Sequence, residues 1–332
     1  MTAARAVLPM VLLIAAGCAP TVIAPGPPTK APVLEADRLV TADGVSLPVR
    51  AWMPAGEPRA VIVALHGFND YGNFFAAPGA FLAERGIATY AYDQRGFGKA
   101  PVRGLWSGGE AMAADLTAMT LRVRERHPGV PLHLLGASMG GAVIMVAMTG
   151  NDPPPADGII LSAPAVWGRE TMPWYQRAAL WVASHTVPWL KVTGRGLKIR
   201  PSDNIEMLKA LAADSLVLHE SRVDTLHGLT DLMGRALAAA PALTGPALVL
   251  YGEHDEIIPP KPTRLMFRRL RGEARLALYD KGFHMLLRDL QGETVWKDID
   301  AWIADGSAPL PSGADQRAET ARADDWRIGG KP

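Results

Sequence analysis

The sequence predicts an α/β fold in which helices flank a mostly parallel sheet, with a helical segment inserted late in the sheet. Three observations predict this fold. Between residues 60 and 162, short apolar runs alternate with longer helical patterns, as in βαβ units. The alternation stops between Ser162 and Leu243 and resumes at Ala247. A serine flanked by glycines also lies where one strand would pass into a helix.

The expected elements follow in chain order. Two short strands at 38–41 and 45–50 flank Ala42-Asp43-Gly44, a composition typical of a hairpin turn. The next strands are expected at 60–65, 87–92, 132–137 and 158–162, with helices near 74–85, 109–127 and 139–149. After the interruption we expect strands at 247–251 and 274–279 and a last helix at 293–304. The folded domain would therefore span residues 33–305.

The interruption, about residues 165–240, predicts a helical cap inserted after the sixth strand. Further helices are expected there at 205–211 and 226–237. Four tryptophans recur at spacings near seven or eight, which indicates an apolar helical stripe: Trp167, Trp174, Trp181 and Trp189. Such a stripe forms core or, in a cap above a reactive serine, a ligand-binding surface, and the sequence leaves both interpretations open.

Gly136-Ala137-Ser138-Met139-Gly140 has the pattern G-x-S-x-G between an apolar run and a buried-helix pattern. This context predicts a nucleophile elbow, a sharp strand-to-helix turn that exposes the serine hydroxyl. Glycines are needed two residues to either side, because side chains there would collide with neighbouring backbone. The N-terminus of the following helix favours developing negative charge. Ser138 is therefore the candidate nucleophile.

Asp255 and His284 are the candidate partners of Ser138. A serine nucleophile needs a base, and the base needs an orienting acid. Asp255 follows one expected strand and His284 follows the next, so both would lie at the carboxyl edge of the sheet. Glu253 comes earlier in its loop and Asp280 directly follows its strand, which makes each a weaker candidate for the acid.

Two backbone N–H groups are expected to stabilise an oxyanion. One would come from Met139, directly after the nucleophile, and the other from Phe68, in the loop after strand 60–65. His66 in the same loop would brace it by hydrogen bonding rather than take part in catalysis.

Five segments resemble landmarks of the α/β-hydrolase superfamily in order and spacing: His66-Gly67, 92–98, 136–141, 251–255 and 282–284. The resemblance covers about residues 37–304 and is closest to the branch of monoacylglycerol lipases and lysophospholipases. It implies Ser138 as nucleophile, Asp255 as acid and His284 as base, with no cofactor.

Several positions depart from the pattern of that branch. Ala137 and Phe97 stand where the family often has histidine, and Lys99-Ala100 replaces small polar residues. None of these departures touches the triad, but they leave the substrate open. Asp93 and Arg95, in the same loop, are expected to pair with each other.

Composition argues against other classes of function. The 332 residues are 48% hydrophobic and 20% charged, which is enough for a full core. A formal net charge of +1 argues against a nucleic-acid surface. No P-loop or dinucleotide fingerprint occurs. No metal site is expected, since His219-Glu220 lacks the second histidine of H-E-x-x-H.

The N-terminus indicates export and lipid attachment. Residues 1–17 contain an apolar run that is too short to span a bilayer. The four residues Ala15-Ala16-Gly17-Cys18 that follow this run resemble a bacterial lipobox. Cys18 would be lipidated, and the Pro-rich segment 18–32 would act as an extended tether. Ala19 is not the aspartate that retains such proteins at the inner membrane, which favours the outer membrane of the cell envelope. A plain cleaved signal with an incidental cysteine is the alternative.

The function expected from these residues is ester hydrolysis by a serine hydrolase, with a monoacylglycerol or lysophospholipid as substrate. A small-ester esterase and an aminopeptidase or amidase of the same superfamily are the alternatives, although proline iminopeptidase-like members usually carry Trp where this chain has Met139. A non-catalytic surface lipoprotein is a third possibility. The segment 306–332, rich in Ala, Gly, Pro and charge, is expected to be disordered.

Overall fold

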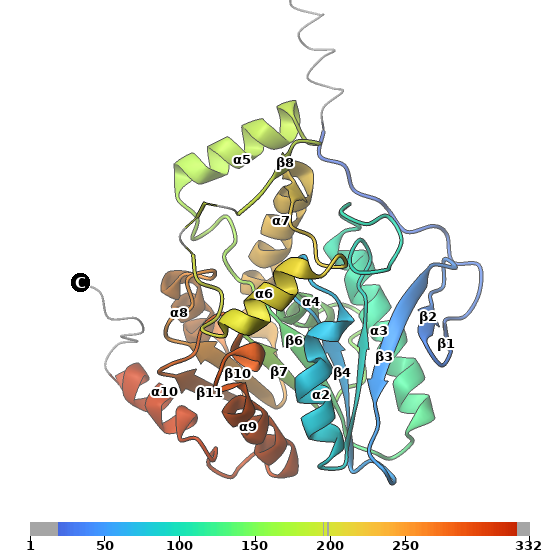
Figure 1. Ribbon diagram of the computed structural model, residues 1–332, viewed down its shortest axis with the longest axis vertical. Coiled ribbons are helices and arrows are strands. Elements are labelled where there is room, and N and C mark those ends of the chain that lie inside the picture. Colours follow the sequence, from blue (N-terminus) through green and yellow to red (C-terminus); the bar gives the residue numbers. More distant parts are fainter. Residues whose placement is uncertain (1–18, 195, 198, 324–332) are drawn as a thin grey trace, which may run out of the picture.

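The computed structural model describes residues 19–323 except 195 and 198. A nine-stranded sheet runs through the molecule in the order β1-β2-β3-β5-β4-β6-β7-β10-β11, with helices on both faces (Figure 1). All pairings from β5 to β11 are parallel, while β1, β2 and β3 pair antiparallel. The predicted α/β fold with a mostly parallel sheet is confirmed.

The strands lie close to their expected positions. Three antiparallel strands come first: β1 (Val33–Leu34), β2 (Arg38–Val40) and β3 (Ser46–Trp52). The parallel strands are β4 (Ala60–Leu65), β5 (Ile87–Tyr92), β6 (Leu132–Ala137), β7 (Gly158–Ser162), β10 (Ala247–Gly252) and β11 (Ala274–Tyr279). Every residue of β4 to β7 and of β10 is buried, as expected for strands covered on both faces.

Helices cover the two faces of the sheet. One apolar core takes side chains from α3 (Gly109–Arg126), α4 (Met139–Met148) and α8 (Pro260–Arg269). The other takes them from α2 (Ala76–Ala83), which follows the 3₁₀ turn η1 (Gly72–Phe75), and from α9 (Gly292–Ala304). Helix α8 was not expected. It starts with proline in its first turn, a position that proline tolerates.

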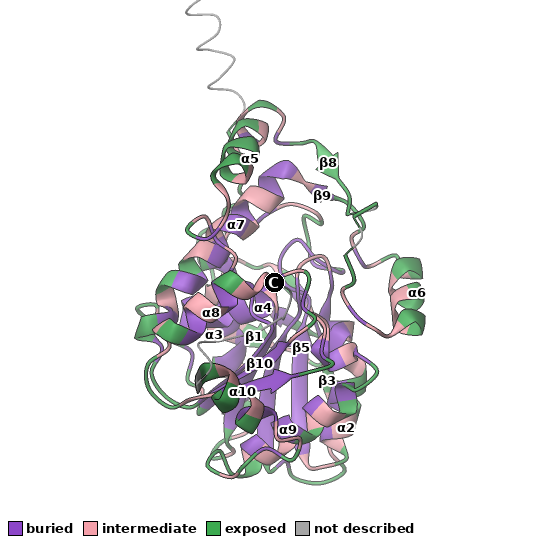
Figure 2. Ribbon diagram, turned by 90° about the vertical axis from the view of Figure 1, so that its left-hand side faces the viewer, coloured by how far each residue is buried: buried purple, intermediate pink, exposed green. Residues whose placement is uncertain are grey.

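A cap is inserted between β7 and β10, as the sequence predicts. It comprises α5 (Trp174–Thr186), β8 (Lys191–Val192), α6 (Ile205–Ala213), β9 (Ser221–Arg222) and α7 (Val223–Ala239). Helix α7 packs on α4, and α5 lies on α7 at the upper end of the molecule (Figures 1 and 2). Only Ser184 is buried in α5, so Trp174 and Trp181 point into solvent rather than forming core or cavity.

The expectation of a disordered tail is wrong for residues 306–323. Helix α10 (Ala314–Ala323) packs against β11, and Leu310, Ala314 and Ala318 are at most 3% exposed. Ala314 and Ala318 are four residues apart, so they lie on the same side of the helix and cover the edge of the sheet, while Leu310 packs into the core just before the helix begins. Residues 324–332 lie outside the described part of the chain.

The segment 19–32 is extended but does not hang free. Ile23 N–H donates to the Trp106 carbonyl at 2.8 Å, Gly26 N–H to Asp43 Oδ2 at 3.1 Å, and Thr29 N–H to the Ala42 carbonyl at 2.8 Å. The expected tether is therefore held along the domain surface, because its backbone groups find partners there. The signal segment 1–17 and Cys18 lie outside the described residues. Within those residues, no helix is long and apolar enough to cross a membrane.

Candidate active site

Ser138 occupies the turn between β6 and α4 in a conformation that few side chains adopt. Its φ is +49° and its ψ is −112°. A Cβ on Gly136 would come within 2.5–2.6 Å of backbone atoms of Gly141 and Gly140, and one on Gly140 would collide with the Leu65 backbone. The glycines of the motif are therefore required by close backbone packing. Strain held in this way is common at functional sites.

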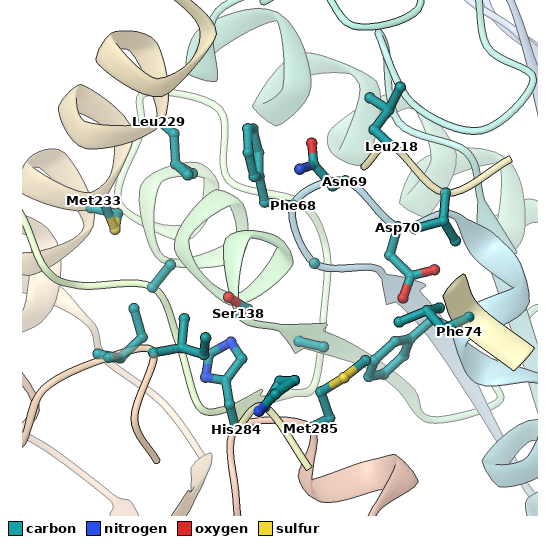
Figure 3. A pocket seen from close by; sticks show the side chains of 18 of the residues that line it. Phe68, Asn69, Asp70, Phe74, Ser138, Leu218, Leu229, Met233, His284 and Met285 are labelled. Atoms are coloured by element: carbon teal, nitrogen blue, oxygen red, sulfur yellow. The ribbon is translucent and has the colours of Figure 1, made fainter. Parts of the chain in front are cut away.

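Asp255 and His284 meet at the carboxyl ends of β10 and β11. Asp255 Oδ2 lies 2.8 Å from His284 Nδ1, and Oδ1 accepts from the Ile257 and Ile258 N–H groups at 2.8 and 2.9 Å. The carboxylate is fully buried and the imidazole is 10% exposed. A proton on Nδ1 leaves Nε2 free as a base. Ser138 and His284 line the same cavity and lie close together in it (Figure 3).

The two rival acids lie elsewhere. Asp280 is exposed to solvent, and Glu253 borders a separate crevice with Gln316 and Arg317. Among these three carboxylates in the described chain, Asp255 is the one bonded to His284. Asp255 follows a buried strand, and backbone N–H groups of its own loop donate to its carboxylate. These hydrogen bonds hold the carboxylate against the imidazole.

Phe68 and Met139 place two backbone N–H groups near the serine. Met139 is the first residue of α4, and Gly67 lies so close that its Cβ would contact the Ser138 Cβ at 3.4 Å. Neither the Phe68 nor the Met139 N–H donates a hydrogen bond to any residue that the structure describes. Both are therefore available to an oxyanion, and the positive end of the α4 dipole adds to their effect.

His66 is a structural residue of the loop that carries Phe68. Its Nδ1 lies 2.8 Å from the Gly67 carbonyl, and its Nε2 accepts from the Gln94 N–H at 3.0 Å. The imidazole is completely buried, and burial lowers its pKa. A neutral ring protonated at Nδ1 satisfies both contacts, so His66 braces the loop.

A cavity of about 490 Å³ opens above Ser138 and His284 (Figure 3). Its walls are mainly apolar, with side chains from both the sheet domain and the cap: Phe68, Phe74, Trp167, Leu218, Leu229, Met233, Ile257 and Met285. Asn69 and Asp70 add a polar edge. The volume lies within the range of about 300–1,000 Å³ usual for small-molecule sites. The lining suits an apolar chain placed next to the reactive serine.

Comparison with known proteins identifies the family. The family described as "Serine aminopeptidase, S33" (Hydrolase_4) matches residues 56–291, which include the three positions predicted to form the triad. The chain belongs to this family. The monoacylglycerol lipase of Mycolicibacterium smegmatis is 26% identical over 270 residues, covering 78% of this chain and 93% of that protein. The monoglyceride lipase of Rattus norvegicus is 28% identical over 284 residues, covering 83% and 93%.

A solved structure shows the same fold. The crystal structure of Paleococcus ferrophilus monoacylglycerol lipase matches with a TM-score of 0.67 at 23% identity, covering 79% of this chain and 99% of that one. The protein therefore has the α/β-hydrolase fold. At the level of the family it is a lipase- or esterase-like serine hydrolase, distantly homologous to monoacylglycerol lipases.

The cap of this hydrolase is bonded directly to the loop that carries Phe68. Asn69 Nδ2 donates to Ser221 Oγ at 2.8 Å, and the Leu218 N–H donates to the Asn69 carbonyl at 2.9 Å. The Tyr71 hydroxyl donates to Asp214 Oδ2 at 2.6 Å. These contacts join segments about 150 residues apart in the sequence, and local sequence patterns gave no indication of them.

Asp289 supports the loop that carries His284 and was also not identified from the sequence. Its Oδ2 accepts from the Phe283 N–H at 2.7 Å, next to His284, and its Oδ1 accepts from Ser202 Oγ at 2.6 Å. Burial raises the pKa of its carboxyl. The acid five residues after His284 was the available signal, but its partner Ser202 lies 87 residues away. Asp289 therefore links the cap segment to the histidine loop.

The expected pair of Asp93 and Arg95 does not form. Asp93 bonds to Arg50 Nη1 at 2.7 Å and accepts backbone N–H groups of its own and neighbouring loops. Arg95 instead bonds to Asp43 and Asp115 at 2.6–2.9 Å. Alternate residues of an extended loop share a face, but each side chain here pairs with an oppositely charged group on a different segment of the chain.

Proposed function

We propose that this hydrolase cleaves carboxylic esters with an apolar acyl chain, such as a monoacylglycerol or a lysophospholipid. The observation that carries the proposal is that Ser138 and His284, which is bonded to Asp255, line an apolar cavity with part of its wall from the cap. The names of the relatives from Mycolicibacterium smegmatis and Rattus norvegicus support a monoacylglycerol as substrate.

The proposed mechanism uses each group in the position described. Ser138 Oγ attacks the acyl carbonyl while His284 Nε2 accepts its proton, and Asp255 stabilises the imidazolium. The Phe68 and Met139 N–H groups hold the oxyanion. His284 then gives its proton to the leaving alcohol, which departs and leaves Ser138 acylated. Water, deprotonated by His284, attacks the acyl-enzyme, and its collapse releases the acid and restores Ser138.

We further propose that the protein is held at a membrane through a lipid on Cys18, in the cell envelope and at the outer membrane. A diacylglyceryl group together with an N-acyl chain exceeds the two signals needed for stable anchoring. Fractionation of cells expressing the native chain and Cys18→Ser tests this location. Native protein in the soluble fraction, or the variant retained in the membrane, would refute it.

A chain-length series tests the substrate class. Each methylene buried in the cavity contributes about 0.8 kcal/mol, which is up to about fourfold in kcat/KM. We expect kcat/KM for p-nitrophenyl esters to rise steadily from C2 to C8. Leu229→Trp, which adds bulk to the cap side of the cavity, should lower the C8 value more than the C2 value. A constant preference for acetate would indicate a small-ester esterase.

The alternatives are separated by two further measurements. A fluorophosphonate probe should label the native chain but not Ser138→Ala, because it reacts with an activated serine. Absence of labelling in the native chain would favour a non-catalytic lipoprotein. Aminoacyl p-nitroanilides should be poor substrates, and hydrolysis of these faster than of the C8 ester would favour an aminopeptidase.

A further inference from the structure

Helix α5 presents an apolar surface that no other described part of the protein covers. Trp174 is 73% exposed and Trp181 is 59% exposed, and they lie on the same side of the helix because they are seven residues apart. Tyr175 and Val182 are more than half exposed beside them. Large aromatic side chains are usually at least partly buried in a protein core or an interface. The exposure of these four side chains on α5 therefore requires an explanation.

The apolar surface continues beyond the helix. Trp189, Leu190 and Val192 are exposed in the turn and strand after α5, and Leu197 and Ile199 are exposed further on. Within the described residues, nine of the sixteen large hydrophobic side chains that are exposed fall between 174 and 199. Exposed apolar groups are therefore concentrated on one part of the cap, as at an interaction site, rather than scattered. We call the exposed side chains from 174 to 199 the cap face.

The segment of sequence that contains the cap face carries only positively charged side chains. Residues 171–202 contain no Asp or Glu and five Lys or Arg: Arg177, Lys191, Arg195, Lys198 and Arg200. The whole chain has a formal net charge of only +1, so this segment differs from the rest of the protein. Aromatic side chains together with lysine and arginine are typical of helices that lie in a membrane interface. Anionic lipid headgroups attract such segments.

The first described residues of the chain lie at the same end of the molecule. Pro20 and Val22 line a crevice together with His185, which belongs to the last turn of α5. The hydrogen bond from Ile23 to Trp106 holds this segment in place. Figure 1 shows the chain entering the fold beside α5 and β8. Any lipid on Cys18 would be attached one residue before Ala19.

We propose that the cap face is a membrane-docking surface, on which α5 lies flat in the interface of a bilayer containing anionic lipid. The positive charge of segment 171–202 fits such a bilayer, and the first described residues, which would follow the lipid proposed on Cys18, lie at the same end of the molecule. Docking is independent of the triad and goes beyond the proposed ester hydrolysis. It would orient the domain with its cap toward the lipid rather than leave it free to rotate about Cys18.

A single fluorescent label tests the orientation. Cys18 is the only cysteine, so the full chain with Cys18→Ser accepts one new cysteine at a chosen position. Ala178 is exposed on α5 between Trp174 and Trp181, and Ala80 is exposed on α2 at the opposite end of the molecule (Figures 1 and 2). Ala178→Cys and Ala80→Cys, each labelled with an environment-sensitive NBD group, form a matched pair.

The label on residue 178 is expected to shift to shorter wavelength when vesicles of phosphatidylcholine and phosphatidylglycerol are added. Spin-labelled lipids in the same vesicles should quench it. The label on residue 80 should show neither effect. Residues 1–17 are present in both proteins, so any binding through that segment contributes equally. A label on residue 178 that stays in water while the protein is bound to vesicles would overturn the proposal.

A second variant separates docking from catalysis. Trp174→Ser together with Trp181→Ser should weaken vesicle partitioning by about tenfold or more. Hydrolysis of a soluble ester should remain unchanged, because neither side chain lines the cavity. Unchanged partitioning would refute the proposal. If the label on residue 178 shifts without vesicles as the protein concentration rises, with a doubling of mass, a second copy of the chain covers this face and the membrane is not its partner.

Discussion

Individual residues explain why this serine is placed to react. Ser138 has a positive φ because Gly136 and Gly140 allow β6 and α4 to approach closely around it. The Asp255 carboxylate is bonded by two backbone N–H groups of its own loop, so it meets His284 in one orientation. Motifs local in sequence fix these positions. For that reason, the sequence alone predicts Ser138, Asp255 and His284 as nucleophile, acid and base, and the structure brings the three residues to one place.

The first prediction concerns the acid. Asp255→Asn should lower kcat by about 10⁴, because the amide favours the wrong histidine tautomer. Ser138→Ala and His284→Ala should each lower it by about 10⁴–10⁶, and the double variant should be little worse, since these groups act as a unit. Steady-state hydrolysis of a soluble p-nitrophenyl ester measures these effects. Asp280→Asn, on the exposed rival, is the control and should keep nearly full activity.

At the scale of helices and strands, the sequence predicts elements correctly where their side chains are buried in a regular pattern. It fails where the burial of a side chain depends on partners that are distant in the sequence. The strands β4 to β7 and β10 are buried throughout, and their apolar runs are continuous in the sequence. In α5, by contrast, the aromatic residues suggested core or cavity, yet the helix extends from the body and leaves Trp174 and Trp181 in solvent. The contact between Asp289 and Ser202 joins two loops and has no local pattern.

Helix α10 provides a test of an element that composition misjudged. Ala318 is 3% exposed in the core cluster on one face of the sheet. Ala318→Asp would bury a carboxylate without a partner and should lower the free energy of unfolding by about 2–4 kcal/mol. Thr320→Asp, at an exposed position of the same helix, should change it by less than about 0.5 kcal/mol. Urea unfolding of both variants measures the difference. Equal effects would mean that α10 does not stabilise the domain.

At the scale of the whole molecule, the parallel sheet brings the loops that carry the candidate catalytic residues to one edge. The same fold buries two histidines in their neutral form. His66 braces the loop after β4, and His133 lies within β6 against Trp302. Burial lowers the pKa of both, and that of His133 to about 4. Unfolding exposes these side chains and returns their pKa values to about 6.5. The folded state therefore loses stability as the pH falls.

The pH dependence of stability follows from the sign of these shifts. For His133 the folded pKa of about 4 lies below the unfolded value of about 6.5, so the unfolded chain binds more protons between these pH values. This residue alone should lower the free energy of unfolding by about 2 kcal/mol from pH 7 to pH 5. Urea unfolding of the native chain and His133→Leu at both pH values measures its share. The variant should lose less stability on acidification, because leucine takes up no proton, while the carboxylates and His66 affect both proteins equally. An identical loss in the two proteins would show that His133 takes up no extra proton on unfolding.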